Sequence, residues 1–423
     1  MNQRFTFYAH TRRNGRPHDE GRVSGGLHPV FPVLMLTLTL MLNACTEQRG
    51  YQQLTGYAQG GTWSVKYNAT GIKARPAEVQ RGIEAILNEI DTTLSGYNKG
   101  SQLSRLNAGD TIRPGRMLLE MYDYGYALWE ETGGAVDVAA GPLFDIWGFG
   151  FKNDSRPSAD KVRATMAVSG MRRLVPTMEE ALSADGRLHR SRLLRGGGGD
   201  SSLTLRMTGS GTGPGMTGND AGPVLNFNAV AQGYSCDTVA RYLNSLGIKD
   251  MLVDIGEIWC SGANPGGRPW RVGVDRPKDG NNTPGADLDG IWESAGGAGR
   301  SGGDHEADRE PALRPGKGQS LAGEGIVTSG NYRKFYMKDG RKISHTIDPR
   351  TGYPAENSLL SATVTAPTAA AADAYATYCM VIGYNAAKEF IEGRAEVEGY
   401  LIFATPDGSM AEWSSAGFRL VSR

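Results

Sequence analysis

The chain has 423 residues, and its 45 lysines and arginines balance 45 aspartates and glutamates, so the formal net charge is zero. A balanced chain has no overall field that would favour nucleic acid or an anionic membrane, so we expect no nucleic-acid partner and look for a local site. The length allows roughly two or three domains, or one large α+β unit with insertions.

An apolar run near the N-terminus predicts export. Residues 30–44 read VFPVLMLTLTLMLNA, which is too short to span a bilayer comfortably and is typical of the hydrophobic part of a signal peptide. The string LNAC, which ends at Cys45, is similar to a bacterial lipobox, whose cysteine is lipidated and becomes the mature N-terminus. We therefore predict a signal peptide with an extended leader at 1–44 and a lipid-anchored linker at 45–57. The alternative is a buried apolar segment with an incidental cysteine.

The expected location is the cell envelope, with the protein anchored to a membrane by lipid on Cys45 and facing the periplasm or the exterior. Cys236, Cys260 and Cys379 then remain in the mature chain. Because their number is odd and they show neither CxxC nor metal-ligand spacing, we expect no disulfide framework.

Periodic apolar residues predict the first elements after the linker. GTWSVKY at 61–67 alternates apolar and polar positions as a strand does. Residues 76–94 have the apolar spacing of a helix, and a second helix fits 117–131. The next segment, TGGAVDVAAGPLFDIWGFG at 132–150, is typical of a loop that approaches another group closely.

Later elements follow the same rules. Helical spacing at 228–246 precedes a strand at 251–255, and a hairpin is expected around 338–341. A strand at 361–365 leads to a long alanine-rich helix at 369–391.

Two segments look inserted, 186–222 and 277–323. Their Gly, Ser, Asp and Pro content cannot bury enough apolar surface to offset the entropy of ordering, so we predict surface loops. The GGGG run in the first segment lacks the GK[ST] ending of a phosphate-binding loop.

His345 lies in the segment SHTIDPRTGYP, residues 344–354. Imidazole is the side chain whose ordinary pKa, about 6.5, lies nearest neutrality, which suits a general base. A histidine packed in a turn, without a catalytic role, is an equally good interpretation of this segment alone.

Asp373 and Thr377 lie four residues apart on a predicted helix, so their side chains project from adjacent turns of one face. A carboxylate and a hydroxyl are hard oxygen donors that suit magnesium or calcium better than zinc, although a local hydrogen bond is the alternative. The predicted helix start at 228–233 offers free amides that favour a phosphate. Together with His345 and the segment 132–150, which we call the glycine-rich loop, these features point to phosphoryl or nucleotidyl transfer.

Eight blocks occur in order along the sequence: GTWSVKY, LSGYNKGSQLSRLN, TGGAVDVAAGPLFDIWGFG, NAVAQGYSCD, SGANPGGRPWRVGV, TSGNYRKFY, SHTIDPRTGYP and ADAYAT. Taken together they closely resemble the FAD:protein FMN transferases of the ApbE family. The resemblance implies a single α+β domain of mixed sheets and helices over 58–423, interrupted by the two glycine-rich insertions.

The resemblance also implies an activity. Members of this family are exported, magnesium-dependent enzymes that cleave FAD and attach its FMN half, through a phosphoester, to a Ser or Thr hydroxyl of a partner protein, releasing AMP. The implied acceptor is an exported flavoprotein, a subunit of a membrane redox complex.

Carried over position by position, the resemblance implies roles for individual residues. Asp373 and Thr377 would bind Mg²⁺ together with the main-chain carbonyl of Ala229, and His345 would act as the base. Asp348 either orients the imidazole or caps the turn. The residues implied to contact FAD are Tyr97, Ala135, Val136, Asp137, Asn226, Gln232 and Ile347. Asn226 and Gln232 depart from the residues most frequent in the family, as does Gly60, which stands where many members have methionine.

Two other functions stay open on the sequence alone. If water replaces the acceptor hydroxyl, the same site is an FAD pyrophosphatase that yields FMN and AMP. The other is a non-enzymatic lipoprotein that holds FAD, which would need no base.

Overall fold

The computed structural model describes residues 50–150, 157–195, 223–279, 281, 285–295, 322–332, 335–338 and 341–421. The predicted leader at 1–44, Cys45 and the larger part of both glycine-rich segments lie outside these ranges. The described residues belong to one unit, Arg49–Arg423. None of the helices in the described ranges is long and apolar enough to cross a membrane.

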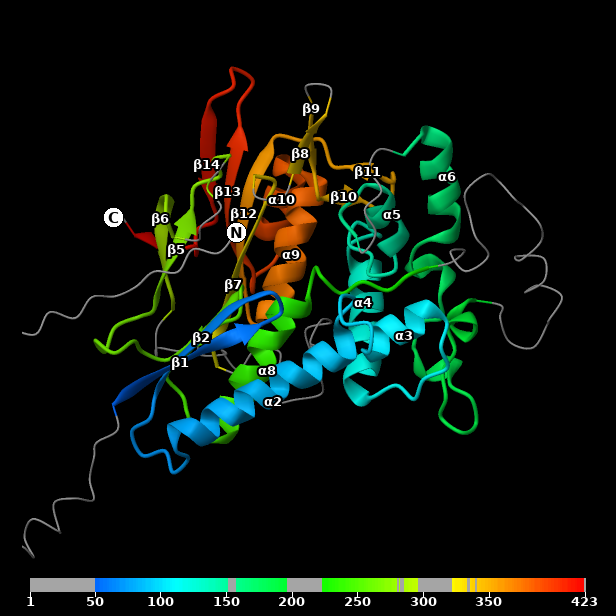
Figure 1. Cartoon of the computed structure of the whole chain (residues 1–423). Helices are drawn as coiled ribbons and strands as arrows, with labels where there is room; N and C mark the ends of the chain where they lie inside the picture. Colours follow the sequence, from blue (N-terminus) through cyan, green and yellow to red (C-terminus); the bar gives the residue numbers. More distant parts are fainter. Residues whose placement is uncertain are drawn as a thin grey trace, which may run out of the picture. The chain divides into compact units, whose positions relative to one another are not determined.

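An eight-stranded antiparallel sheet is the main element of this unit, with strand order β1-β2-β3-β4-β7-β12-β13-β14 (Figure 1). Strands distant in the sequence become neighbours, since Tyr67 of β2 pairs with Met251 of β3 and Ile258 of β4 pairs with Ile326 of β7. The strands are β1 Tyr51–Ala58, β2 Gly61–Asn68, β3 Met251–Asp254, β4 Ile258–Ser261, β7 Glu324–Gly330, β12 Leu359–Ala366, β13 Glu398–Ala404 and β14 Met410–Ser414.

The remaining elements are shorter sheets and helices. A three-stranded sheet has the order β15-β6-β5, and β8 with β9 and β10 with β11 form two hairpin ribbons. The strands are β5 Arg271–Asp275, β6 Leu288–Glu293, β8 Phe335–Lys338, β9 Arg341–Ser344, β10 Ile347–Asp348, β11 Tyr353–Pro354 and β15 Leu420–Val421. The α-helices are α2 Pro76–Leu94, α3 Gln102–Ala108, α4 Arg116–Glu131, α5 Gly141–Ile146, α6 Ala159–Val168, α8 Ala231–Ser245, α9 Ala369–Ile382 and α10 Tyr384–Glu392. Short 3₁₀ turns are η2 Met171–Arg173, η3 Glu179–Ala181 and η4 Arg190–Leu193.

Each face of the main sheet carries its own hydrophobic core, because successive side chains of a strand point to opposite faces. On β13, Leu401 belongs to the larger core, whereas Tyr400 and Ile402 belong to a second one with Trp270 and Trp292. Helix α9 packs on β7 and β12, and α8 packs on β3, β4 and α9, so these helices cover the first face. Trp270 directly precedes β5, and Trp292 lies in β6. Because both belong to the second core, the three-stranded sheet packs against the second face.

The crossing of α8 and α9 is close because of Gly233. A Cβ atom at Gly233 would lie 2.3 Å from the carbonyl oxygen of Ala369, the first residue of α9. Real side chains do not reach such distances, so this position needs a residue without a Cβ. The starts of the two helices are thereby held in contact.

The α+β expectation is confirmed, and several elements fall where the sequence pattern predicts them. The strand predicted at 61–67 is β2, the helix predicted at 76–94 is α2, and the helix predicted at 117–131 is α4. The predicted hairpin around 338–341 is β8 with β9.

Other boundaries are corrected by the structure. Residues 51–57, assigned to the linker, form β1, which pairs with β2 along its whole length and buries Leu54. The helix expected over 369–391 is two helices, because Gly383 adopts φ 79° and ends α9. The segment 277–323, expected to be loop, contains β6, in which Trp292 is buried. An average composition over a long segment hides a short strand whose stability comes from its partners.

Candidate active site

Two buried carboxylates connect α8 and α9 in opposite directions. Asp237 of α8 accepts hydrogen bonds from the amides of Ala369 and Ala370 at 2.8 and 3.0 Å, and so caps the start of α9. Asp373 of α9 accepts a hydrogen bond from the amide of Gly233 in the first turn of α8 at 3.2 Å. Each helix start therefore receives a carboxylate from the other helix, and we refer to Asp237 and Asp373 as the buried carboxylate pair.

Three oxygen atoms near this pair lack hydrogen-bond partners among the described residues. The amide of Gly233 donates to Asp373 Oδ2 instead of to the carbonyl of Ala229, four residues earlier. Among the described residues, neither that carbonyl nor Asp373 Oδ1 receives a hydrogen bond. The Thr377 hydroxyl has no hydrogen-bond partner in the described part of the chain either, whereas the hydroxyls of Ser235 and Thr238 on α8 donate to the carbonyl four residues earlier. One carboxylate, one hydroxyl and one carbonyl oxygen are thus available for a ligand.

The electrostatics of the pair are unfavourable without a cation. Burial raises the pKa of Asp373 well above its ordinary value, the Gly233 amide lowers it, and the charge of Asp237 raises it further. Burial also raises the pKa of Asp237 to about 6, against the lowering effect of the α9 amides. Because both shifts report a cost of burying negative charge, a cation at Asp373 would stabilise the ionised form.

The chemistry of the three oxygen atoms fits a hard divalent cation. Magnesium takes oxygen ligands, completes its shell with waters and ligand phosphates, and needs only one or two protein carboxylates. No group of three or more His, Cys, Asp or Glu side chains that could hold a metal occurs among the described residues. The set formed by Ala229, Asp373 and Thr377 offers only oxygen donors, and for that reason it suits magnesium better than a metal that prefers nitrogen or sulfur.

The turn that precedes α8 lies beside Tyr97 and the glycine-rich loop. Asn228 donates a hydrogen bond of 3.4 Å to the hydroxyl of Tyr97, whose side chain is 66% exposed. Asn226 accepts a hydrogen bond from the Asn228 amide at 2.9 Å through its side chain, and its own amide donates to Val138 at 2.7 Å. Asn228, which directly precedes Ala229, therefore links Tyr97 to Asn226.

Gln232 lies in the first turn of α8 and reaches the turn between β3 and β4. Its side-chain amide donates to the carbonyl of Ile255 at 3.4 Å. The structure thus places Gln232 on the same helix start as Ala229 and Gly233.

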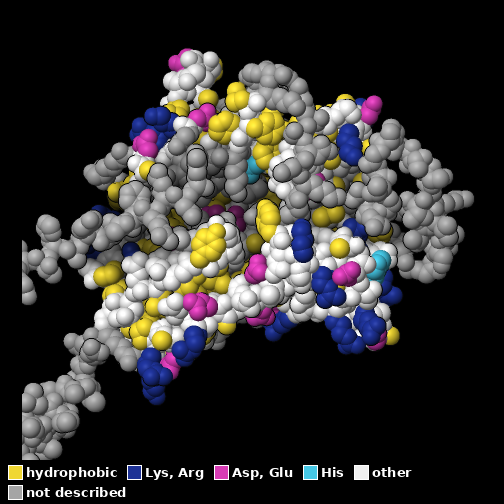
Figure 2. Space-filling view, viewed as in Figure 1, with side chains coloured by type: hydrophobic (Ala, Val, Ile, Leu, Met, Phe, Trp, Pro, Cys, Tyr) yellow, Lys and Arg dark blue, Asp and Glu magenta, His cyan; other side chains and the backbone are white. Residues whose placement is uncertain are grey.

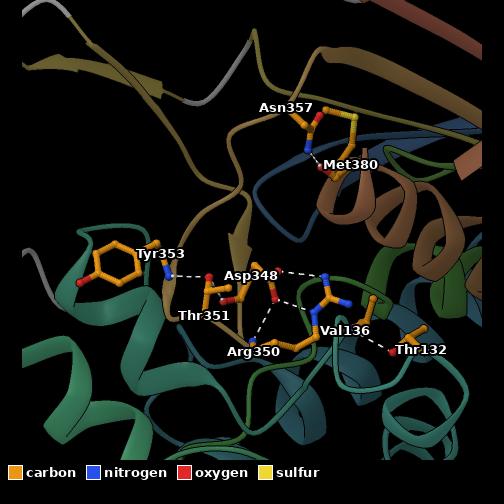
Figure 3. A network of polar contacts seen from close by, with 8 residues as sticks. All are labelled: Thr132, Val136, Asp348, Arg350, Thr351, Tyr353, Asn357 and Met380. Atoms are coloured by element: carbon orange, nitrogen blue, oxygen red, sulfur yellow. Dashed lines mark hydrogen bonds and ion pairs between the residues drawn. The ribbon is translucent and has the colours of Figure 1, made fainter. Parts of the chain in front are cut away.

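The glycine-rich loop is held by its own polar side chains. Thr132 donates to the carbonyl of Leu128. It also accepts from the amide of Val136, and Figure 3 shows this second bond. Asp137 accepts from the amides of Ala139 and Met171 at 2.8 and 3.1 Å. Burial raises the pKa of Asp137 to about 6 in spite of these two bonds, which lower it. Ala135 and Val136 are buried, so packing holds this part of the loop in place.

His345 follows β9 and is partly exposed. Its ring lies edge-on to that of Phe149, with the centroids 6.3 Å apart, and Phe149 stacks on Tyr336. Trp147, two residues before Phe149, donates from its indole nitrogen to the carbonyl of Gly352 at 2.8 Å. The end of the glycine-rich loop is therefore tied to the turn that follows His345.

Asp348 is engaged by Arg350. The two carboxylate oxygens accept hydrogen bonds of 2.9 Å from the amide, Nε and Nη2 of Arg350 (Figure 3). These bonds favour the turn-capping role of Asp348 over the orientation of the imidazole. In Figure 3 the Arg350 side chain extends toward Val136, and its Cγ lies 3.8 Å from where a Cβ of Gly134 would be. The glycine-rich loop is thus in contact with both the α8 start and the His345 turn.

Ile347 is placed differently from the other predicted contacts. Its side chain is 2% exposed and packs with Leu143, Trp147 and Val162 beneath the turn. The side chain of Ile347 therefore belongs to the core, and a contact with FAD would fall to its backbone. Cys45 lies outside the described residues.

The molecular surface has a hollow on the side of the protein that faces the viewer in Figure 2. Figure 2 shows a hollow near the middle of this face, with hydrophobic, acidic and histidine side chains around it. Such a mixture of an apolar margin and a few converging polar groups is typical of small-molecule sites.

Asp237 and Arg350 organise this site, and the sequence alone predicts no role for either of them. A signal for Asp237 was present, because it shares the buried face of α8 with Gly233, Cys236 and Ala240. An acidic residue on an apolar helix face requires a partner. The partner, the start of α9, could not be read from the sequence.

Comparison with known proteins gives a consistent result. The model of the ApbE family matches residues 60–401. The chain is similar to the FAD:protein FMN transferase of Escherichia coli (strain K12), with 31% identity over 373 residues that cover 86% of this chain and 88% of the relative. The corresponding protein of Salmonella typhimurium is 30% identical over 381 residues, which cover 88% and 90%.

Solved structures agree. The flavin transferase ApbE from Vibrio cholerae aligns with a TM-score of 0.62 at 27% identity, covering 87% of this chain and 98% of that one. The apo form of the flavinyl transferase ApbE from Pseudomonas stutzeri aligns with a TM-score of 0.63 at 26% identity, covering 86% and 95%. By family model, relatives and fold alike, the chain belongs to the ApbE family.

Proposed function

We propose that this protein is an FAD:protein FMN transferase. It cleaves the diphosphate of FAD, attaches the FMN half by a phosphoester to a Ser or Thr hydroxyl of an acceptor protein, and releases AMP. The observation that carries the proposal is the set of available oxygen atoms on Ala229, Asp373 and Thr377 beside an anion-favouring helix start. The names of the curated relatives support the same reaction.

In this proposal Ala229, Asp373 and Thr377 hold Mg²⁺, which supplies charge neutralisation for the diphosphate of bound FAD. Tyr97, Asn226 and Gln232, all in contact with the α8 start or part of it, bind the dinucleotide from one side. Ala135, Val136 and Asp137 line the site from the glycine-rich loop, which adjoins the α8 start through the bond from Asn226 to Val138. Ile347 contributes its backbone.

His345 accepts the proton of the acceptor hydroxyl as that oxygen bonds to the FMN phosphorus and the bond from phosphorus to the AMP oxygen breaks. Its partial exposure beside the rings of Phe149 and Tyr336 leaves the imidazole accessible to a protein substrate. Arg350 and Asp348 keep the following turn in shape.

Replacement of His345 tests this role. We expect His345→Ala to lower the rate of FMN transfer at least about a hundredfold, because general base catalysis contributes roughly that much. His189→Ala is the matched control, since His189 lies in a loop and bonds to Ser191. A His345→Ala enzyme that transfers FMN at the parental rate would show that the base is another group.

One incubation separates transfer from the two other functions. The purified protein is mixed with FAD, Mg²⁺ and a Thr-containing acceptor, and AMP and flavin fluorescence on the acceptor are measured. Transfer gives both signals, an FAD pyrophosphatase gives AMP alone, and an FAD-binding lipoprotein gives neither.

We further propose that the protein is exported, lipidated on Cys45 and held at a membrane of the cell envelope, where its acceptor is an exported flavoprotein subunit of a redox complex. The lipobox-like LNAC string supports this location. In cells grown with radiolabelled palmitate, the full chain should take up the label and Cys45→Ser should not. Label on Cys45→Ser, or no label on the parent, would contradict the lipid anchor.

A further inference from the structure

The buried carboxylate pair contains one member with no role in the proposed reaction. Asp237 is 1% exposed, and both of its oxygens are occupied by the amides of Ala369 and Ala370. It is therefore not available as a ligand. Asp373, four residues after Ala369 on the same helix, has Oδ1 free of hydrogen bonds from the described residues and is 6% exposed.

Helix capping alone does not account for an aspartate at this position. The start of α9 already has a cap, because the Thr368 hydroxyl accepts from the amide of Ala371 at 3.1 Å. A neutral Asn could accept from both amides through the two lone pairs of its oxygen, at a smaller cost of burial. Instead the chain buries a second acidic group one helical turn after Gly233, the residue whose amide bonds to Asp373, so the two carboxylates lie on adjoining turns of the same helix contact.

Two buried like charges destabilise the protein unless a cation binds beside them or a proton neutralises one of them. The same repulsion makes the binding of a cation more favourable, because the cation removes it. In addition, the two bonds from Asp237 fix the first turn of α9 against α8, and the position of that turn determines where the Asp373 carboxylate lies relative to Ala229 and Gly233.

We propose that Asp237 is a positioning residue of the cation site: it holds the first turn of α9 so that Asp373 faces the α8 start, and its charge strengthens cation binding without contact with the ion. This inference rests on the proposed metal-dependent function.

The test measures cation affinity directly. Mn²⁺ is titrated into the FAD-bound protein in the absence of acceptor, and free Mn²⁺ is followed by electron paramagnetic resonance. Asp237→Asn should raise the dissociation constant about tenfold, the usual effect of losing a residue that supports a metal ligand. Thr368→Ala removes the other α9 cap and is the matched control. It should lower the unfolding temperature and leave the dissociation constant within about twofold of the parent.

Parental Mn²⁺ affinity in Asp237→Asn, or equal effects in Asp237→Asn and Thr368→Ala, would overturn the inference. If Asp237→Asn does not fold, Asp237→Glu takes its place, because it keeps the charge and displaces the carboxylate by one methylene. It should bind Mn²⁺ roughly threefold more weakly, and parental affinity would again overturn the inference.

Asp373→Ala separates this failure from failure of the proposed function. If Asp373→Ala abolishes Mn²⁺ binding while Asp237→Asn does not change it, only the role of Asp237 is wrong. If Asp373→Ala binds Mn²⁺ as the parent does, the cation site itself is wrong and the inference falls with it.

Discussion

Asp137 is partly buried and accepts hydrogen bonds from two backbone amides in the glycine-rich loop and the segment that follows it. Its pKa is raised to about 6 by burial, above the ordinary value of 3.8. Because the folded protein then holds this proton at a pH where the unfolded chain has lost it, the group favours the folded state at low pH. That contribution is lost as the pH rises through about 6.

Asp137→Asn should remove this dependence. Between about pH 7 and about pH 4.5, the free energy of unfolding of the parent should rise by about 2 kcal/mol relative to Asp137→Asn. Urea denaturation at the two pH values measures the difference. Asp160→Asn, at an exposed carboxylate on α6, should show no such change relative to the parent. A constant difference between parent and Asp137→Asn would show that the proton is not taken up there.

Tyr124 and Tyr122, both buried on α4, form a natural comparison. The Tyr122 hydroxyl donates to the carbonyl of Val175 at 2.7 Å, whereas the Tyr124 hydroxyl has no partner among the described residues. Tyr122→Phe should cost about 1 kcal/mol of unfolding free energy because it removes a hydrogen bond. Tyr124→Phe should be neutral or stabilising, and a loss as large as that of Tyr122→Phe would reveal a bound water or ligand at the hydroxyl.

At the scale of elements, the break between α9 and α10 depends on Gly383. Its φ of 79° is unfavourable for other residues, and a Cβ there would lie 3.0 Å from the Cβ of Asn357. Asn357 also donates to the carbonyl of Met380 at 3.0 Å, as Figure 3 shows, so it cannot easily move away.

Gly383→Ala should therefore destabilise the protein by more than Gly408→Ala. Gly408 has nearly the same φ, 82°, with open space around its Cβ position, so its substitution measures the backbone cost alone, about 1 kcal/mol. We expect roughly a further 1 kcal/mol at Gly383 from the contact with Asn357. Thermal unfolding of both variants measures the difference, and equal losses would mean that Asn357 moves aside.

The helices and strands that sequence predicted are those with strong local patterns. Helix α2 has apolar residues at helical spacing, and all of the positions so identified are buried or partly buried. β1 and β6 were not predicted as strands, because they depend on pairing with β2 and with β5 and β15. The break at Gly383 was missed because a glycine within an alanine-rich run does not end a helix by itself.

The candidate site was predictable to the extent that its residues lie in recognisable blocks. Asp373 and Thr377 could be grouped by spacing along one helix, and Tyr97, Asn226 and Ala229 by resemblance. Asp237 could not, because its partners, the amides at the start of α9, lie far away in the sequence. For Ile347 the resemblance of SHTIDPRTGYP to the family implies a contact with FAD, whereas the fold buries its side chain in the core.

For the whole molecule, we predict that the two faces of the main sheet differ in function. The helices α8 and α9 cover one face and carry Gln232, Asp373 and Thr377. The second core, on the other face, contains Trp292, Trp270 and Phe418 and none of the residues of the proposed site. We expect Trp292→Ala to lower the free energy of unfolding by about 3–5 kcal/mol. The transfer rate per folded molecule should stay at the parental value.

Chemical denaturation and the rate of AMP release at low temperature measure these two effects, with Trp292→Phe as the milder variant. A fall in the rate per folded molecule would show that the second core supports the site as well as the fold.

The pairing of β2 with β3 has a consequence for how the protein folds. Tyr67 meets Met251 across this pair, so the hairpin of β1 and β2 is synthesised long before the strand that completes its hydrogen bonds. Non-local pairings of this kind form late and slowly, because a long loop must close first. The outer edge of β2 in the early hairpin therefore stays unpaired while residues 69–250 are made. Any factor that keeps the nascent chain from aggregating has to protect that edge until residue 251 and its neighbours arrive.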